Sequence, residues 1–214
     1  TAFASPTNAG SVAGGGVYLV GSNAVLTATA PNAWQFVQWN DGITNNPRYL
    51  TVPATNITYT ATFAPTATIT LVANPSAGGS VTGGGTFLVG TTNWITATAS
   101  NNWVFVRWSD NSTHNPYAIV VASNQTFTAE FTAAATVTTL AVPPQGGSTT
   151  GDGSYAIGSP ATLMATASNG WVFLNWNGTV TNYVQTGDTN NPLEIRVASS
   201  VTYVANFAQV ENGF

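Results

Sequence analysis

The sequence predicts an all-β protein made of three tandem small antiparallel β-domains, and three observations lead to this prediction. A short aromatic segment recurs three times along the chain. The apolar runs are short, rich in Val, Thr, Ile and aromatic residues, and interrupted by Gly, Asn and Pro, as in strands joined by turns. No stretch shows the i, i+3, i+4 apolar spacing of an amphipathic helix. We therefore expect small antiparallel sheets with little or no helix.

The repeat is defined by the aromatic segments WQFVQW, WVFVRW and WVFLNW, which begin at residues 34, 103 and 171. Glycines, prolines and phenylalanines before and after them recur in the same order. These positions divide the chain into repeat 1 (1–64), repeat 2 (65–133) and repeat 3 (134–208), followed by a tail (209–214). Repeat 3 carries extra residues near 178–189, which predict a lengthened surface loop.

Repeat 2 illustrates the expected order of elements. A first strand, TITLVANP, ends at a proline and leads into the glycine-rich hairpin AGGSVTGGG. The strands that follow are expected in TFLVG, TNWITATA and WVFVRW, then, after the loop SDNSTHNP, in YAIVVA and QTFTAEF.

The aromatic segments are predicted to form the cores, because large aromatic side chains dominate buried area. Strict alternation along WVFVRW would place Trp103, Phe105 and Arg107 on one face and Val104, Val106 and Trp108 on the other. Both faces would then be mostly apolar, and we expect both to be covered. The alternative is a sugar-stacking platform beside the Asp/Asn loops. The predicted core aromatics are Trp34, Phe36, Trp39, Trp103, Phe105, Trp108, Trp171, Phe173 and Trp176.

Trp94 stands outside the repeat pattern, since Val25 and Thr162 occupy its position in the other copies. The parity of its strand directs it outward. It is either an anchor for a contact between copies or subunits, or a side chain lying flat over its own sheet.

The order GG…G-x-Y-x-x-G…A-x-A…W-x-F-x-x-W…NP…A-x-F, present three times, resembles the divergent internalin-type B-repeat, also called the bacterial repeat domain. The resemblance implies a surface or secreted bacterial protein in which repeats act as stalks, spacers, or adhesive and assembly modules. It supplies no catalytic residues, and we expect no enzyme. The internalin repeats are β-grasp domains with a short helix, but this sequence offers no helical segment. The resemblance therefore implies β-grasp-like domains or small sandwiches with little or no helix.

Composition narrows the function further. Charged residues make up 5% of the chain, lysine is absent, and the three cationic side chains are Arg48, Arg107 and Arg196. This composition cannot neutralise a run of phosphates, so nucleic-acid binding is not expected. The absence of cysteine excludes disulfides. No apolar run is long enough for a membrane span. We expect an extracellular or cell-surface location, reached with a signal peptide already removed.

No cofactor is predicted. Asp41, Asp110 and Asp188 are weak calcium candidates, because a calcium site needs six to eight oxygens and each loop supplies one carboxylate. The alternative for these loops is an Asx turn before a proline. Glycosylation acceptor patterns occur at Asn56, Asn111, Asn124 and Asn177. An intact mass equal to the 22.0 kDa polypeptide would exclude glycosylation.

The two ends of the chain suggest self-association. Repeat 1 lacks a counterpart of TATI at 66–69, and the tail after Phe207 has the length to supply it. Either the protein is a filament or sheath subunit that assembles head to tail, or it is a segment of a longer repeat array. The alternative function is a carbohydrate-binding or adhesive module for surface glycans, using exposed Trp and the Asp/Asn loops. The predicted interface residues are Trp94, Thr1, Phe3, Val210 and Phe214.

Overall fold

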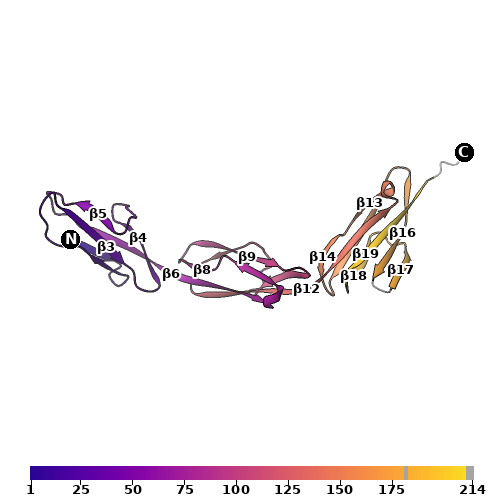
Figure 1. Ribbon diagram of the computed structural model, residues 1–214, viewed down its shortest axis with the longest axis horizontal. Coiled ribbons are helices and arrows are strands. Elements are labelled where there is room, and N and C mark those ends of the chain that lie inside the picture. The colour runs from indigo at the N-terminus through magenta and orange to yellow at the C-terminus, as the bar shows by residue number, and fades with distance from the viewer. Residues whose placement is uncertain (181–182, 211–214) are drawn as a thin grey trace. The chain divides into compact units, whose positions relative to one another are not determined.

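The computed structural model describes residues 1–180 and 183–210, and it confirms the all-β prediction with three tandem repeats (Figure 1). Helical structure in the described residues is limited to the 3-10 turns Ser76–Gly78 and Pro144–Gly146. Each turn follows the proline that ends the first strand of its repeat, where the missing N–H of proline favours a change of direction.

Each repeat contains one three-stranded antiparallel sheet, in which the longest strand lies between a short strand of three or four residues and the strand that follows the Asn-Pro turn. Apolar residues alternate along the central strand and face the core. These sheets are β2 (Ser11–Ala13), β3 (Asn23–Thr29) and β5 (Arg48–Thr51); β7 (Gly79–Thr82), β9 (Thr92–Ala99) and β11 (Tyr117–Val120); and β13 (Gly147–Thr150), β15 (Pro160–Ala167) and β18 (Leu193–Arg196).

The remaining strands belong to a ten-stranded hydrogen-bonded set. In it, the first strand of a repeat pairs in parallel with the last one, as between β1 and β6 and between β12 and β19. Purely antiparallel pairing was expected, but the intervening strands cross to the three-stranded sheet, so the chain returns in the same direction. The set comprises β1 (Ala2–Ser5), β4 (Trp34–Trp39), β6 (Tyr59–Asn74), β8 (Gly85–Leu88), β10 (Trp103–Trp108), β12 (Gln125–Val142), β14 (Gly153–Ala156), β16 (Trp171–Val180), β17 (Tyr183–Asp188) and β19 (Val201–Gln209).

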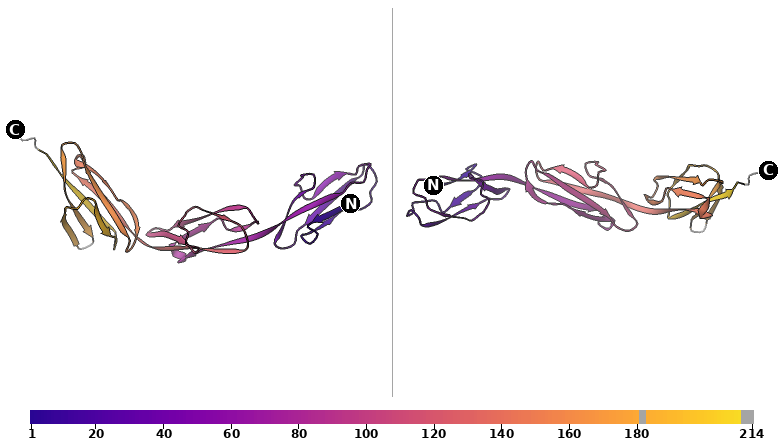
Figure 2. Two further views of the ribbon diagram at one scale, coloured as in Figure 1. Left: turned by 180° about the vertical axis from the view of Figure 1, so that it is seen from behind. Right: turned by 90° about the horizontal axis from the view of Figure 1, so that it is seen from above.

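Strands β6 and β12 each belong to two repeats. The predicted repeat boundaries, 64/65 and 133/134, fall inside these strands. Figure 2 shows both as continuous ribbons. The last strand of one repeat therefore becomes the first strand of the next without a loop between them.

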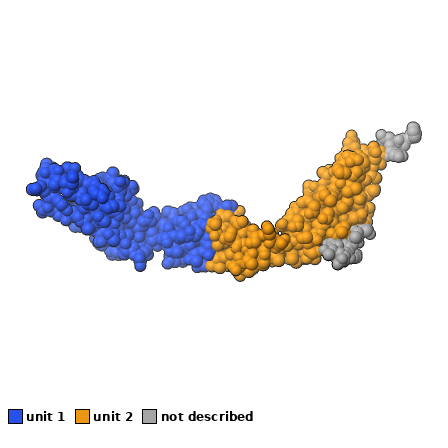
Figure 3. Space-filling model, in the orientation of Figure 1, with its two compact units in different colours: residues 1–71, 83–95, 116–127 blue, residues 72–82, 96–115, 128–214 orange. Residues whose placement is uncertain are grey.

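The chain forms two compact units (Figure 3). Unit 1 comprises residues 1–71, 83–95 and 116–127. It contains all of repeat 1 and the part of repeat 2 where β8 pairs with β6 and β11 pairs with β9. Unit 2 comprises residues 72–82, 96–115 and 128–214. It contains the pairings β7–β9 and β10–β12, and the described residues of repeat 3.

The extra residues of repeat 3 that the structure describes lie in two paired strands rather than in the predicted loop. Strand β16 continues past the aromatic segment to Val180, and β17 pairs antiparallel with it. An insertion with alternating Thr, Val and Tyr can extend an existing sheet edge, which satisfies its backbone hydrogen-bonding groups.

The aromatic segment contains a β-bulge in every repeat, which corrects the strict alternation expected from the sequence. In repeat 2, Phe105 lies opposite Phe131 while Arg107 lies opposite Glu130, so Val106 is the extra residue. The bulge places Phe105 and Trp108 on the same face, with ring centroids 5.5 Å apart. On the opposite face, Val106, Val172 and Leu174 are exposed, whereas Val37 and Val104 are half-buried, so the described residues cover this face only in part.

The second tryptophan of each segment is fully buried, whereas the first tryptophan and the phenylalanine are half-buried at the edge of the same core. The indole N–H of Trp39 donates to the carbonyl of Asn45, and that of Trp108 to the carbonyl of His114. Trp176 lacks such a partner among the described residues, at the place where the hairpin of repeat 3 replaces the shorter loop.

Candidate functional site

A strand segment completes the same edge of repeats 2 and 3. In repeat 2, residues 66–69 of β6 pair antiparallel with β8, and in repeat 3, residues 134–137 of β12 pair with β14 in the same register. We call 66–69 and 134–137 the closing segments. Each enters its repeat directly from the last strand of the repeat before it.

The closing segments direct two side chains into the core. Ala67 and Ala135 occupy the first inward position, and Ile69 and Val137 occupy the second, where each is only 1% exposed. Burial of a branched aliphatic side chain contributes on the order of 2 kcal/mol. The closing segment is therefore part of the hydrophobic core of the repeat that it enters.

Polar contacts fix the register of the closing segments. The backbone N–H of Thr68 donates to Oδ1 of Asn124 at 2.7 Å, and that of Thr136 donates to the hydroxyl of Ser200 at 3.1 Å. The backbone N–H groups of Val89 and Ile157 donate to the carbonyls of Pro65 and Ala133, at 2.9 and 3.0 Å.

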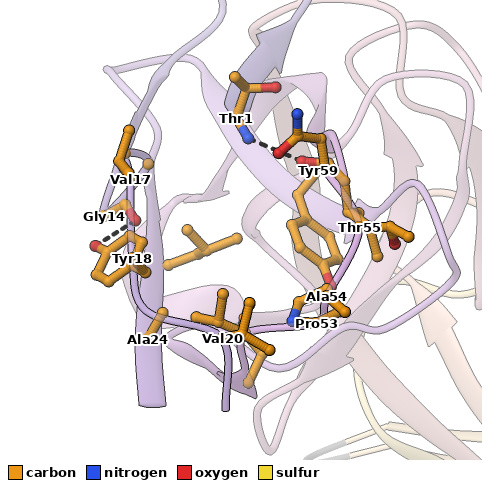
Figure 4. Close-up of a pocket in the computed structure, with 17 residues that line it drawn as sticks. Thr1, Gly14, Val17, Tyr18, Val20, Ala24, Pro53, Ala54, Thr55 and Tyr59 are labelled. Atoms are coloured by element: carbon orange, nitrogen blue, oxygen red, sulfur yellow. Dashed lines mark hydrogen bonds between the residues drawn. The ribbon is translucent and has the colours of Figure 1, made fainter. Parts of the chain in front are cut away.

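Repeat 1 is open at the equivalent place, and we call this opening the repeat 1 groove. It encloses about 200 Å³. Figure 4 shows it between the 14–20 segment on one side and Thr55 and Tyr59 on the other. Its apolar floor comprises Ala24, Leu26, Leu50 and Val52.

The groove leaves apolar side chains without cover. Val17 and Leu19 are 102% and 83% exposed, whereas Leu88, the counterpart of Leu19 in repeat 2, is half-buried. Residues 16–19 form no strand, although their counterparts in the other repeats are β8 and β14. In repeats 2 and 3, the strand at this edge is paired with a closing segment, which satisfies its backbone hydrogen-bonding groups.

The rim of the groove carries polar groups of the kind that fix the register elsewhere. Thr55 and Asn56 line it at the turn that supplies Asn124 in repeat 2 and Ser200 in repeat 3. Both are exposed. The groove therefore combines apolar lining residues, a backbone segment outside any strand at 16–19, and hydrogen-bonding side chains at its rim.

The predicted interface residues lie in different places. Thr1 lines the groove, and its ammonium group donates to the carbonyl of Ile57 at 2.8 Å. Phe3 and Val210 are exposed on β1 and just after β19. Trp94 is 60% exposed on the outer face of β9, which fits the predicted outward direction. Phe214 lies outside the described residues.

The three calcium candidates lie in Asx turns. The carboxylates of Asp41, Asp110 and Asp188 each accept a backbone N–H from the residue two positions later. Asp41 also forms a salt bridge with Arg48, whose hydrogen bonds are the main cause that lowers the pKa of this carboxyl. Within residues 1–180 and 183–210, no three His, Cys, Asp or Glu side chains gather as metal ligands.

The glycosylation candidates differ in their surroundings. Asn56 and Asn111 are exposed, and Asn56 lies at the groove. Asn124 is exposed but accepts the hydrogen bond from Thr68. Asn177 is half-buried, and its Oδ1 accepts the backbone N–H of Gly187 at 3.0 Å.

Sequence reasoning missed the role of the asparagine before proline. In repeat 2, Oδ1 of Asn115 accepts the N–H of Ala97 at 2.9 Å, and its Nδ2 donates to the carbonyl of Ala97 at 2.6 Å. Asn46 and Asn191 make the same pair of bonds in the other repeats. The recurrence of Asn at this one position in all three copies was the available signal.

Comparison with known proteins gives a consistent family result. The divergent InlB B-repeat domain matches the chain three times in tandem, over residues 1–67, 69–135 and 137–211. A search of curated proteins finds no match. Among the described residues, no helix has the length and apolar character that crossing a membrane requires.

Proposed function

Because the chain belongs to the divergent InlB B-repeat family, we propose that it is a non-enzymatic structural protein of the bacterial cell surface or extracellular matrix. Its three repeats serve as a stalk or as the subunit of a head-to-tail filament or sheath. The family is associated with bacterial surface proteins, and a low charge with many Thr, Ser, Asn and Gly residues suits an extracellular setting.

The strand that neighbouring repeats share is the observation that carries this proposal. The chain closes the same edge of repeats 2 and 3 with a strand that arrives from the preceding repeat. The same strand exchange between two molecules would join the last repeat of one copy to the first repeat of another. Such a contact is heterologous, so it propagates into a filament unless it closes into a ring.

The test is assembly of the full chain and of a chain lacking residues 209–214. Negative-stain images and light scattering should show ordered filaments or oligomers for the full chain and monomers for the truncated chain. Circular dichroism checks that the truncated chain keeps its β structure. Ordered filaments formed by the truncated chain would refute head-to-tail assembly through the tail. If the full chain stays monomeric, the filament role is refuted and only the role as a stalk remains.

A carbohydrate-binding or adhesive module is the second candidate, favoured by two exposed aromatic side chains. Trp94 lies on β9 opposite Ala118 of β11. In repeat 1 Val25 occupies the position of Trp94, and the exposed aromatic ring is that of Tyr49, which lies opposite Val25 on β5 and is 77% exposed. Exposed aromatic rings on a sheet can stack against sugars. Binding to insoluble polysaccharides that is lost in the Trp94→Ala variant would support this candidate.

A further inference from the structure

The first and last strands of repeat 3 lie side by side and run in the same direction. Residues 137–142 of β12 pair in parallel with residues 201–206 of β19. The chain enters the repeat through β12 and continues out of its core through β19. Tension along the chain therefore pulls β12 backwards along its axis and β19 forwards. The pair is loaded in shear, so the evenly spaced hydrogen bonds between the two strands share the force and must break together.

Each of these two strands is also held by a second neighbour. Residues 134–137 of β12 pair antiparallel with β14, and residues 202–209 of β19 pair antiparallel with β16. On β12, the backbone N–H and the hydroxyl of Thr139 donate to the carboxylate of Asp152, at 2.6 and 2.8 Å. Withdrawal of either strand from the sheet therefore requires the loss of two pairings.

The paired segments also share a core. Val137 on β12 is buried, and so are Val201 and Ala205 on β19. All three belong to the hydrophobic cluster of repeat 3 that contains Trp176 and Phe207. Sliding of one strand past the other would expose these side chains to water together. Apolar burial therefore adds to hydrogen bonding in the resistance to shear.

The same arrangement occurs in repeat 1, and shared strands connect neighbouring repeats. Residues 2–5 of β1 pair in parallel with residues 59–62 of β6, and β6 and β12 are neighbours in the ten-stranded set. Because β6 and β12 are continuous strands (Figure 2), tension passes between repeats through backbone that is already extended. A tandem array built in this way lengthens little until a repeat ruptures.

We propose that the parallel pair β12–β19, and the matching pair β1–β6, are mechanical clamps that allow the protein to withstand tension along its chain. The source of the tension rests on the proposed function, in which a stalk or filament is pulled from both ends. The clamp adds the direction in which a repeat is strong. Force along the strands loads every strand pair together, whereas force across them separates the pairs one at a time from one end.

Pulling the full chain through two alternative pairs of handles tests the clamp. The chain contains no cysteine, so two introduced cysteines are its only thiols. The Thr136→Cys/Gln209→Cys chain is pulled along the strands, because Thr136 precedes the paired segment of β12 and Gln209 ends β19. The Gln145→Cys/Gln209→Cys chain is pulled across them, because both handles follow the same end of the pair. All three side chains are exposed.

Optical tweezers at one pulling speed should give a rupture force at least about twofold higher for the Thr136/Gln209 handles than for the Gln145/Gln209 handles. Urea denaturation should give both chains the same stability, which assigns the difference to direction. Equal rupture forces would overturn the clamp without affecting assembly, which is measured with no applied force. A chain that stays monomeric and still shows the directional difference supports the clamp and refutes only the filament.

A matched pair of substitutions separates the clamp from general stability. Val137→Ala removes buried methyl groups from the paired segment, and Asn191→Ala removes two hydrogen bonds to Ala165 in the other sheet of the repeat. Both should lower stability in urea. With the Thr136/Gln209 handles at constant force, Val137→Ala should raise the rupture rate at least about threefold, and Asn191→Ala should change it by less than about twofold. A larger effect of Asn191→Ala than of Val137→Ala would overturn the clamp.

Discussion

The backbone N–H of Thr68 donates to the side chain of Asn124, 56 positions away in the sequence, at a distance of 2.7 Å. This bond connects a closing segment to the turn that precedes the last strand of its repeat. Thr136 and Ser200 repeat the arrangement at 3.1 Å. The repeat thus uses one side chain to fix a strand that enters from its neighbour.

The Asn124→Ala variant should weaken this connection. Loss of one hydrogen bond to a partly exposed strand is expected to lower the free energy of unfolding by about 1 kcal/mol. The amide of Thr68 should exchange its hydrogen faster, as measured by NMR. Asn101→Ala, in an exposed turn, is the control and should leave that amide unchanged. Unaltered protection of Thr68 in the Asn124 variant would contradict the role of the bond.

The Asn115→Ala variant should be more damaging. The side-chain amide of Asn115 bonds to both the N–H and the carbonyl of Ala97, which is buried. Removing this amide would leave two backbone groups without their partners. We expect a loss of about 2 to 3 kcal/mol in the free energy of unfolding, measured by urea denaturation. The Asn115→Asp variant keeps the acceptor for the N–H of Ala97 but loses the donor to its carbonyl. If Asn115→Ala and Asn115→Asp both lose no more stability than Asn101→Ala, the role of Asn115 is contradicted.

Asp152 should make stability depend on acid pH. The backbone N–H and the hydroxyl of Thr139 donate to its carboxylate at 2.6 and 2.8 Å. The backbone bond is the largest cause that lowers the pKa of this carboxyl, and burial opposes it. A carboxylate with a depressed folded pKa stabilises the protein above its unfolded pKa, and this contribution is lost as the pH falls through the folded value.

The stability difference between the natural chain and Asp152→Asn should therefore shrink below about pH 4. Asp41, whose pKa is also lowered, is present in both proteins and cancels in the comparison. Thermal unfolding from neutral to acid pH measures the difference. A difference that stays constant across this range would show that the charge of Asp152 does not contribute.

Tryptophan quenching tests the placement of the aromatic residues. Trp39, Trp108 and Trp176 are fully buried, whereas Trp94 is exposed, so acrylamide should quench Trp94 most strongly. Trp94→Phe should remove the largest part of the quenchable emission. Polysaccharides should leave the emission of the natural chain unchanged; a shift that disappears in Trp94→Phe would favour the carbohydrate-binding candidate.

The aromatic segments show how local sequence can mislead about strand faces. The spacing W-x-F-x-x-W separates Phe105 from Trp108 by three residues, which strict alternation assigns to opposite faces. The bulge at Val106 restores both to one face. Three aromatic residues at this odd spacing, repeated in every copy, favoured a bulge over alternation, since exposure of such large side chains is costly.

The sequence by itself determined the β class, the three repeats and the family, because repetition, turn residues and β-branched runs are local properties. Only the tertiary structure decided the parallel pairing of first and last strands, the hairpin of repeat 3 and the groove. Each of these depends on which strand edges lie side by side in the folded chain, because that decides which backbone groups form hydrogen bonds with each other.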